Sequence, residues 1–254
     1  MSSQSLEQSA AYKSFMKSPQ PSFKHTSYFE VYDEIFERYR GREITFVEIG
    51  ILDGGSLFMW RDFFGPQARI IGVDLNPDAK KWEAEGFEIY IGSQSDPSFW
   101  SSFFEQVGPV DILLDDGGHT FVQQIVTVEL ALEHIVSGGL LVVEDTHTSY
   151  LSGFGDKSRS FIKYVERWIE KINSRSSRFK QVQNDRRIWG VEVYESIVSF
   201  KINHEASNRA SKPCRNRSTD GGSDVFRNHP SNNQDKNRAR IDMIMQRAFE
   251  LFRD

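Results

Sequence analysis

The chain has 254 residues with a formal net charge of −5, and its 38% hydrophobic and 13% aromatic residues can fill a sizeable core, which excludes a disordered or collagen-like chain. The single cysteine, Cys214, excludes an intramolecular disulfide and a zinc site with several thiolates, so a bound metal would need oxygen ligands. Because it has no run of about 18 apolar residues, no signal-peptide core and no positive net charge, we expect a cytoplasmic protein without membrane or nucleic-acid partners.

Residues 1–40 are predicted to form a helical cover that precedes the first strand. Ser27 can cap a helix in this region. Six large apolar side chains that follow it would share one face of that helix, namely Tyr28, Val31, Tyr32, Ile35, Phe36 and Tyr39.

Residues 41–202 alternate short apolar runs with helical patterns, which is typical of parallel strands joined by right-handed crossovers. The runs are rich in Ile, Val and Leu, and they comprise Ile44 to Ile49, Arg69 to Val73, Phe87 to Ile91, Val110 to Leu114 and Leu140 to Val143. The helical patterns comprise Ser56 to Phe64, Pro97 to Val107, Phe121 to Ile135 and Ser158 to Asn173. The segment Arg187 to Ile202 is typical of an antiparallel hairpin. We therefore predict an α/β fold with a Rossmann-like, doubly wound, mostly parallel seven-stranded sheet and an antiparallel edge hairpin.

The composition changes near Ile202. Residues 1–202 carry a net charge of −8, whereas residues 203–254 carry +3. Residues 203–236 are mostly Asn, Ser, Arg, Asp and Gly, so we predict a flexible linker. Residues 237–254 have apolar side chains at helical spacing and are predicted to form an amphipathic helix that docks on its own core or on a partner subunit.

The loop after the first predicted strand is rich in glycine, from Glu48 to Ser56. Ligands in such sheets bind at the carboxyl ends of the strands, where glycines let the backbone approach a nucleotide-like ligand. Leu52 stands where a dinucleotide-binding motif would need glycine, so a nicotinamide or flavin cofactor fits poorly. Asp74 ends the second strand, where its carboxylate could accept hydrogen bonds from both hydroxyls of a ribose.

Several of these loop residues resemble the S-adenosylmethionine (SAM) site of class I methyltransferases. The resemblance implies that the cofactor contacts Glu48, Gly50, Gly55, Ser56, Asp74, Ser93, Gln94 and Asp115. Many relatives have Asp where Ser93 stands, so the adenine contact could pass to Gln94 or to a backbone group. An ordinary tight turn at Gly54-Gly55 is the structural alternative.

Carboxylates and histidines follow the fourth and fifth strands, in Asp115-Asp116-Gly117-Gly118-His119 and in Glu144-Asp145-Thr146-His147. These strand ends should be neighbours, and three carboxylates in one cleft favour a bound hard cation such as Mg²⁺. Glu144 and Asp145 can both reach one ion only if the strand breaks into a loop there. His119 could then act as general base, with His147 in reserve. For each residue alone, a simple turn or a solvated histidine would also account for the pattern.

The chain resembles the metal-dependent sugar O-methyltransferases of antibiotic biosynthesis, particularly those of the mycinamicin type, from about His25 to Ile202. The resemblance is carried by Phe46-Val47-Glu48-Ile49-Gly50, Gly55-Ser56-Leu57, Met59-Trp60, Gly72-Val73-Asp74, Gln94-Ser95-Asp96, Asp115 to His119, Glu144-Asp145-Thr146, Tyr150 and Gly153-Phe154-Gly155. It implies Mg²⁺ or Mn²⁺ on Asp116, Glu144 and Asp145, His119 as the base, and a homo-oligomer. Tyr150 and His147 are candidate acceptor-binding residues. The segment Thr148 to Asp156, which contains Tyr150, could form a lid whose aromatic ring stacks on a sugar, and it could equally be a structural loop.

The expected function is SAM-dependent methylation of a sugar hydroxyl on a glycosylated natural product or glycan. Methylation of a catechol-like phenol uses the same arrangement of a diol on a metal and is the nearest competing activity. The same fold would also serve a hydroxylase-associated protein like those of cephalosporin synthesis, or a non-catalytic SAM-binding partner protein. An RNA methyltransferase fits less well, because the basic tail lacks aromatic residues between its arginines.

Overall fold

A computed structural model describes residues 3–175, 185–209, 214 and 242–247. The chain divides into two compact units, Met1–Ser211 and Lys212–Asp254. In the second unit, residues 242–247 are helical with exposed side chains, and the rest of the predicted helix over 237–254 lies outside the described residues.

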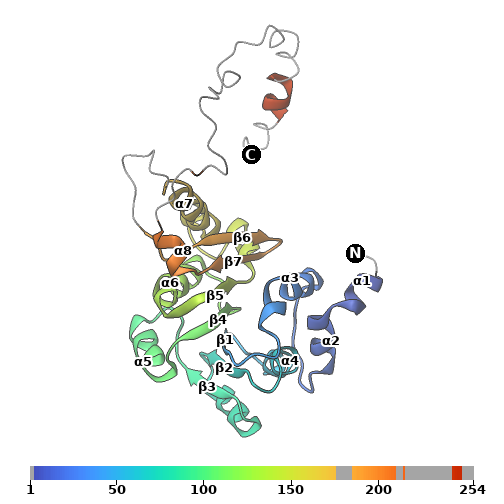
Figure 1. Cartoon of the computed structure of the whole chain (residues 1–254). Coiled ribbons are helices and arrows are strands. Elements are labelled where there is room, and N and C mark those ends of the chain that lie inside the picture. The colour runs from blue at the N-terminus through green and yellow to red at the C-terminus, as the bar shows by residue number, and fades with distance from the viewer. Residues whose placement is uncertain (1–2, 176–184, 210–213, 215–241, 248–254) are drawn as a thin grey trace. The chain divides into compact units, whose positions relative to one another are not determined.

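The first unit is built on one seven-stranded sheet with the order β3-β2-β1-β4-β5-β7-β6 (Figure 1). The first five strands pair in parallel, and β6 and β7 form the antiparallel edge. The prediction of a doubly wound, mostly parallel sheet with an edge hairpin is therefore confirmed. The strands are β1 (Thr45–Ile49), β2 (Arg69–Asp74), β3 (Glu88–Ile91), β4 (Val110–Asp115), β5 (Ile135–Val143), β6 (Gly190–Tyr194) and β7 (Ile197–Lys201).

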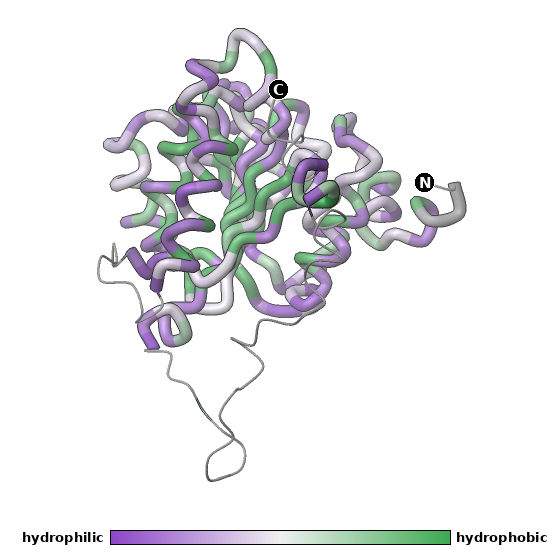
Figure 2. Tube along the Cα trace, turned by 90° about the horizontal axis from the view of Figure 1, so that it is seen from above, coloured by the Kyte–Doolittle hydropathy of each residue, from purple (hydrophilic) through white to green (hydrophobic). Residues whose placement is uncertain are grey.

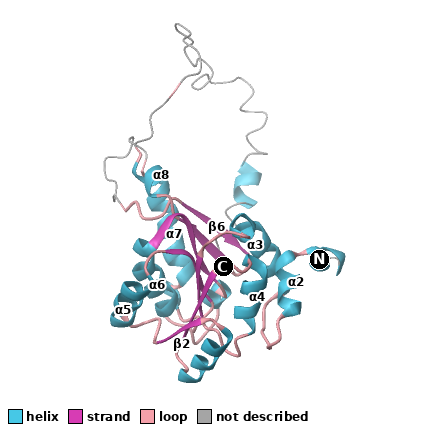
Figure 3. Ribbon diagram, turned by 60° about the horizontal axis from the view of Figure 1, so that its bottom comes forward, coloured by secondary structure: helices cyan, strands magenta, loops and turns pink. Residues whose placement is uncertain are grey.

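Helices lie on both sides of the sheet (Figure 3). The α-helices are α1 (Ser3–Gln8), α2 (Ala10–Lys17), α3 (Thr26–Phe36), α4 (Gly55–Phe64), α5 (Pro97–Val107), α6 (Phe121–Ala131), α7 (Phe161–Asn173) and α8 (His204–Asn208). The 3-10 helices are η1 (Glu37–Tyr39), η2 (Pro77–Glu85), η3 (Leu132–His134), η4 (Thr146–Tyr150) and η5 (Lys157–Arg159). The fragment α8 lies inside the segment predicted to be a flexible linker.

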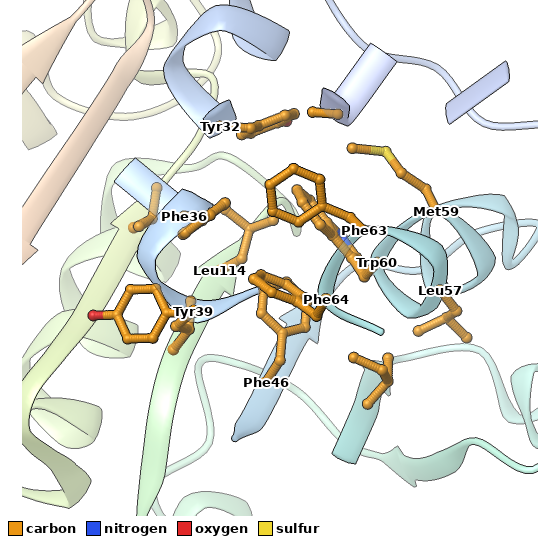
Figure 4. Close-up of a cluster of buried hydrophobic side chains, with 14 of the residues drawn as sticks. Tyr32, Phe36, Tyr39, Phe46, Leu57, Met59, Trp60, Phe63, Phe64 and Leu114 are labelled. Atoms are coloured by element: carbon orange, nitrogen blue, oxygen red, sulfur yellow. The ribbon is translucent and has the colours of Figure 1, made fainter. Parts of the chain in front are cut away.

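The sheet separates two apolar cores, as expected for strands that bury both faces. The apolar strands run through the middle of the molecule in Figure 2. One core joins α3 and α4 to the sheet, with Trp60 packed against Tyr32, Phe36 and Phe64 (Figure 4). The other core buries apolar side chains of α5, α6 and α7. The strands are thus packed on both faces, and the carboxyl ends of the five parallel strands lie at one edge of the sheet.

Several local predictions differ from the structure, and the fifth strand begins at Ile135 rather than at the predicted Leu140. The helix expected to be capped by Ser27 begins at Thr26, and no side chain caps it, so Ser27 lies inside the first turn. The helix expected to reach Ile135 ends at Ala131, because Ile135 already pairs with Val110 in β5. The helix expected from Ser158 begins at Phe161, after the cap Ser160.

Candidate functional site

A cavity of about 360 Å³ opens at the carboxyl ends of the parallel strands. Its wall includes residues from the loops after β1, β2, β3, β4 and β5, together with Lys24 and His25 of the N-terminal segment. Of the described residues, four other than glycine have positive φ, and three of these line the cavity, namely Leu52, His119 and Asp145. Backbone strain of this kind often marks functional loops.

The first glycine loop is held to the second strand by Asp74. One carboxylate oxygen of Asp74 accepts hydrogen bonds from the backbone amides of Ile51 and Leu52, at 3.0 and 3.2 Å. Gly50 has a φ of +84°, which favours glycine. Both Gly50 and Asp74 line the cavity. The predicted cofactor residues at the ends of β1 and β2 therefore meet at one wall.

Glu48 lies behind this wall rather than on it. It is fully buried and accepts hydrogen bonds from the Ser56 hydroxyl at 2.6 Å and the Trp60 indole at 3.1 Å. Burial raises the pKa of Glu48 above its ordinary value. Ser56 reaches a smaller adjoining cavity of about 190 Å³. Gly55 lies outside both linings, where an added Cβ would come within 2.3 Å of the Pro21 carbonyl oxygen.

Gln94 connects the loops after β3 and β4. Its side-chain amide donates to both oxygens of Asp115, at 2.9 and 3.0 Å, and its carbonyl accepts from the Gly118 amide at 2.8 Å. Ser93 and Gln94 line the cavity, whereas Asp115 is buried behind them. Burial raises the pKa of the Asp115 carboxyl.

Asp116, His119 and Asp145 form the acidic side of the cavity. One potential ligand atom of each lies within 4.8 Å of the others, which is a spacing that a single metal ion can span. His119 Nε2 lies 3.3 Å from Asp145 Oδ2. The strand β5 ends at Val143, and Asp145 has a φ of +54°, so the chain does break into a turn where the sequence required it.

Glu144 lies beside this group but faces a different set of partners. Its carboxylate accepts a short hydrogen bond from Tyr32 and another from the Lys24 ammonium at 3.0 Å. Complete burial raises the pKa of Glu144 above its ordinary value, although the positive charge of Lys24 opposes this shift. The helix α3 also contacts Asp145, because the hydroxyl of Tyr28 donates a hydrogen bond to Asp145 Oδ1 at 2.5 Å.

Lys24 is a site residue that no sequence pattern predicted, and the site roles of Tyr28 and Tyr32 were not predicted either. Its Nζ lies 2.7 Å from Asp116 and 3.6 Å from Glu48, and its side chain is only 2% exposed. Burial alone would lower the pKa of Lys24, but the nearby carboxylates of Asp116 and Glu144 raise it well above its usual value. A single lysine between two helices gives no sequence pattern that would reveal this position.

The two residues predicted to bind the methyl acceptor, His147 and Tyr150, lie outside the cavity lining. His147 Nδ1 is 3.9 Å from Asp145 Oδ1, is buried and has no hydrogen-bond partner among the described residues. Its ring meets His25 edge to face, with 6.0 Å between centroids. Tyr150 is 68% exposed and lies outside the cavity lining.

The chemical groups in this site suit the two expected ligands, a nucleoside-containing cofactor and a divalent metal ion. Glycine backbone and a strand-terminal carboxylate suit a nucleoside, and carboxylate oxygens suit a hard divalent cation. Among the residues that the structure describes, no helix has the length and apolar character that a bilayer crossing requires.

Comparison with known proteins finds similar methyltransferases. Residues 47–146 match the family described as "Methyltransferase domain". The chain is 36% identical over 184 residues to demethylmacrocin O-methyltransferase of Streptomyces fradiae. This alignment covers 66% of this chain and 46% of that protein. It is 33% identical over 184 residues to mycinamicin VI 2''-O-methyltransferase of Micromonospora griseorubida, with the same coverage of 66% and 46%. The chain thus spans about half the length of the curated relatives it matches.

A solved structure is also similar. The methyltransferase MycE of the mycinamycin biosynthetic pathway, in complex with Mg, SAH and mycinamycin VI, superposes with a TM-score of 0.69 at 27% identity. The superposition covers 81% of this chain and 55% of MycE. The chain therefore has the fold of the class I methyltransferases, its residues 47–146 match a methyltransferase domain, and it resembles the macrolide sugar O-methyltransferases of the mycinamicin type.

Proposed function

We propose that this chain is a SAM-dependent, metal-dependent O-methyltransferase that methylates a sugar hydroxyl of a glycosylated natural product or glycan. The observation that carries the proposal is that Asp116, His119 and Asp145 open onto the same cavity as the glycine loop and Asp74. A methyl donor held by the loops and a hydroxyl held by the acidic group would then meet in one space.

The cofactor half of the cavity suits SAM. Asp74 uses its two oxygens to accept from three backbone amides, those of Ile51, Leu52 and Asn76. A carboxylate offers about four lone pairs, so it can still accept from a ribose hydroxyl. Ser93 and Gln94 line the wall where we place the adenine, and Gly50 lets the backbone approach the amino acid portion. Glu48, Gly55, Ser56 and Asp115 shape these loops from behind.

We assign Asp116, Glu144 and Asp145 as the carboxylates that hold Mg²⁺ or Mn²⁺. When bound, the ion supplies a fixed positive charge that orients an acceptor hydroxyl and lowers its pKa. We assign His119 as general base rather than ligand, because its contact with Asp145 fixes the ring and leaves Nδ1 to take the hydroxyl proton. The oxygen then forms a bond to the methyl carbon as the carbon–sulfur bond breaks.

The acceptor class is supported by the relatives. One relative, 29% identical over 190 residues, is named as a methyltransferase of a rhamnosyl tetracenomycin in Streptomyces olivaceus, and another is named for mycinamicin VI. His147 Nδ1 lies 3.9 Å from Asp145 Oδ1, and we place the sugar beside it, with the exposed ring of Tyr150 as a second acceptor contact. We also propose a homo-oligomer, which light scattering of the purified chain would test.

The proposal is tested by calorimetric titration with SAM, followed by transfer of a labelled methyl group to rhamnosyl glycosides and to a catechol. We expect one-site binding, methylated glycoside, and loss of transfer with a chelator that Mg²⁺ restores. Transfer only to the catechol would contradict the acceptor class. SAM binding without transfer to any acceptor would favour a non-catalytic SAM-binding partner, and the absence of binding would contradict the cofactor.

A further inference from the structure

Lys24 places a buried cation inside the group of carboxylates that we assign to the metal. Its ammonium donates to Asp116 Oδ2 at 2.7 Å and to Glu144 Oε2 at 3.0 Å, so it lies between the two side chains. A third carboxylate, Glu48, is 3.6 Å away. The ammonium therefore stands at the position from which one cation can contact Asp116 and Glu144 together.

The charge of this region explains why a cation is held there. Glu48 and Glu144 are fully buried, and Asp116 and Asp145 are mostly buried. Buried carboxylates without a counter-ion are strongly destabilising, and a paired cation offsets that cost. Among the described residues, Lys24 is the only Lys or Arg within ion-pair distance of any of these side chains, and it reaches three of them, Glu48, Asp116 and Glu144. In the absence of metal, it is thus the cation that balances the site.

Lys24 belongs to a segment that covers the glycine loop, residues 18–25, which we call the N-terminal strap. Ser18 donates its hydroxyl to the Gly55 carbonyl at 2.8 Å. The Pro21 carbonyl packs so closely that a Cβ at Gly55 would lie 2.3 Å from it. Pro21, Ser22 and Phe23 line the smaller cavity together with Gly50 and Ser56. Any movement of Lys24 away from the carboxylates must therefore be accommodated by a segment that covers the proposed cofactor site.

We propose that Lys24 and the divalent cation compete for Asp116 and Glu144, so that metal binding displaces the ammonium and loosens the N-terminal strap. Two cations cannot occupy the same place between one pair of carboxylates, and a doubly charged ion is bound more strongly there than an ammonium. The inference rests on the proposed function, since it takes these two residues as metal ligands. Under this proposal, metal binding loosens the segment that covers the cofactor cavity, so metal binding and access to that cavity depend on each other.

The accessibility of Lys24 tests the proposal directly. The full chain is treated with an amine-acetylating reagent without metal and with saturating Mn²⁺, and acetylation of each lysine is followed by mass spectrometry. Lys17, whose side chain is 64% exposed, is the internal reference. We expect Lys24 to react at least tenfold more slowly than Lys17 without metal and to approach the rate of Lys17 with bound Mn²⁺. Persistent protection of Lys24 in the Mn²⁺-bound chain would overturn the proposal.

Metal affinity provides the second measurement. Mn²⁺ binding is followed by electron paramagnetic resonance for wild type, Lys24→Met and the control Lys17→Met, which removes an exposed lysine of the same N-terminal region. We expect Lys24→Met to bind Mn²⁺ about tenfold or more tightly than wild type, and Lys17→Met to be unchanged. Equal or weaker binding by folded Lys24→Met contradicts competition. If Lys24→Met does not fold, the acetylation experiment on wild type still decides.

Neither readout depends on methyl transfer, so the two proposals can fail separately. If the chain neither binds SAM nor transfers methyl, but Mn²⁺ still releases Lys24, the proposed function is wrong and the competition stands. If the chain transfers methyl but Lys24 stays protected when Mn²⁺ is bound, the competition is wrong and the proposed function stands. If neither wild type nor Lys24→Met binds Mn²⁺, the competition is rejected.

Discussion

The carbonyl oxygen of Asp116 lies 2.2 Å from the position that a Cβ atom on Gly50 would take. The loops after β1 and β4 are joined here, because the Asp116 amide also donates to the Ile49 carbonyl at 3.0 Å. The cofactor loop and the acidic loop are therefore in direct backbone contact. This contact requires glycine at position 50, because a Cβ atom there would collide with the Asp116 backbone.

We predict that Gly50→Ala destabilises the fold and weakens SAM binding. The added methyl group would meet the Asp116 backbone, and the φ of +84° is unfavourable for alanine. We expect the free energy of unfolding to fall by about 1–3 kcal/mol and SAM affinity to fall tenfold or more, measured by urea unfolding and calorimetry. Gly108→Ala is the control, since φ is +79° there but nothing lies within 4 Å. Equal losses in both variants would mean that the contact is unimportant.

The role assigned to His119 predicts that His119→Ala binds SAM normally but transfers methyl slowly. General-base catalysis typically contributes about 10²-fold or more, so the single-turnover rate should fall by that factor. His134→Ala is the matched control, because His134 precedes β5 at the opposite end of the sheet. Transfer at the wild-type rate in His119→Ala would reject its assignment as the base.

Asp145→Asn should reduce metal affinity, because it removes a negative charge from the cluster of Asp116, His119 and Asp145, whose potential ligand atoms lie within 4.8 Å of one another. We expect Mn²⁺ to bind tenfold or more weakly and turnover to require more metal. The comparison is Glu105→Gln, which neutralises an exposed acid of α5 and should change neither quantity. Unchanged Mn²⁺ affinity in Asp145→Asn would show that Asp145 is not a ligand.

Trp60 links the core to the site, because its indole donates to buried Glu48 at 3.1 Å. Trp60→Phe keeps an aromatic ring but leaves this carboxylate with one donor fewer. The expected loss is about 1–3 kcal/mol of unfolding free energy, the usual cost of an unsatisfied buried group. Trp189→Phe, at a half-exposed site, should change stability by less than about 0.5 kcal/mol. Chemical denaturation of both variants measures the difference.

The sequence by itself determined the sheet and the location of the chemistry. Runs such as Leu140 to Val143 are apolar because both faces of a parallel strand are buried, so such strands can be predicted from the local sequence. The residues at the carboxyl end of each strand, such as Asp74, and those just after it, such as Asp116, are then placed at one edge by the topology alone. Helix ends were less predictable, because tertiary pairing decided them, as at Ile135.

Only the tertiary structure decided which side chains face the cavity and which stand behind it. Glu48 and Asp115 turn into the protein because Trp60 and Gln94 offer them hydrogen-bond donors. Lys24 reaches Asp116 across 92 residues of sequence, through a segment without periodicity or a motif. Its position follows from the need of buried carboxylates for a counter-ion, a requirement of the folded site that no local pattern expresses.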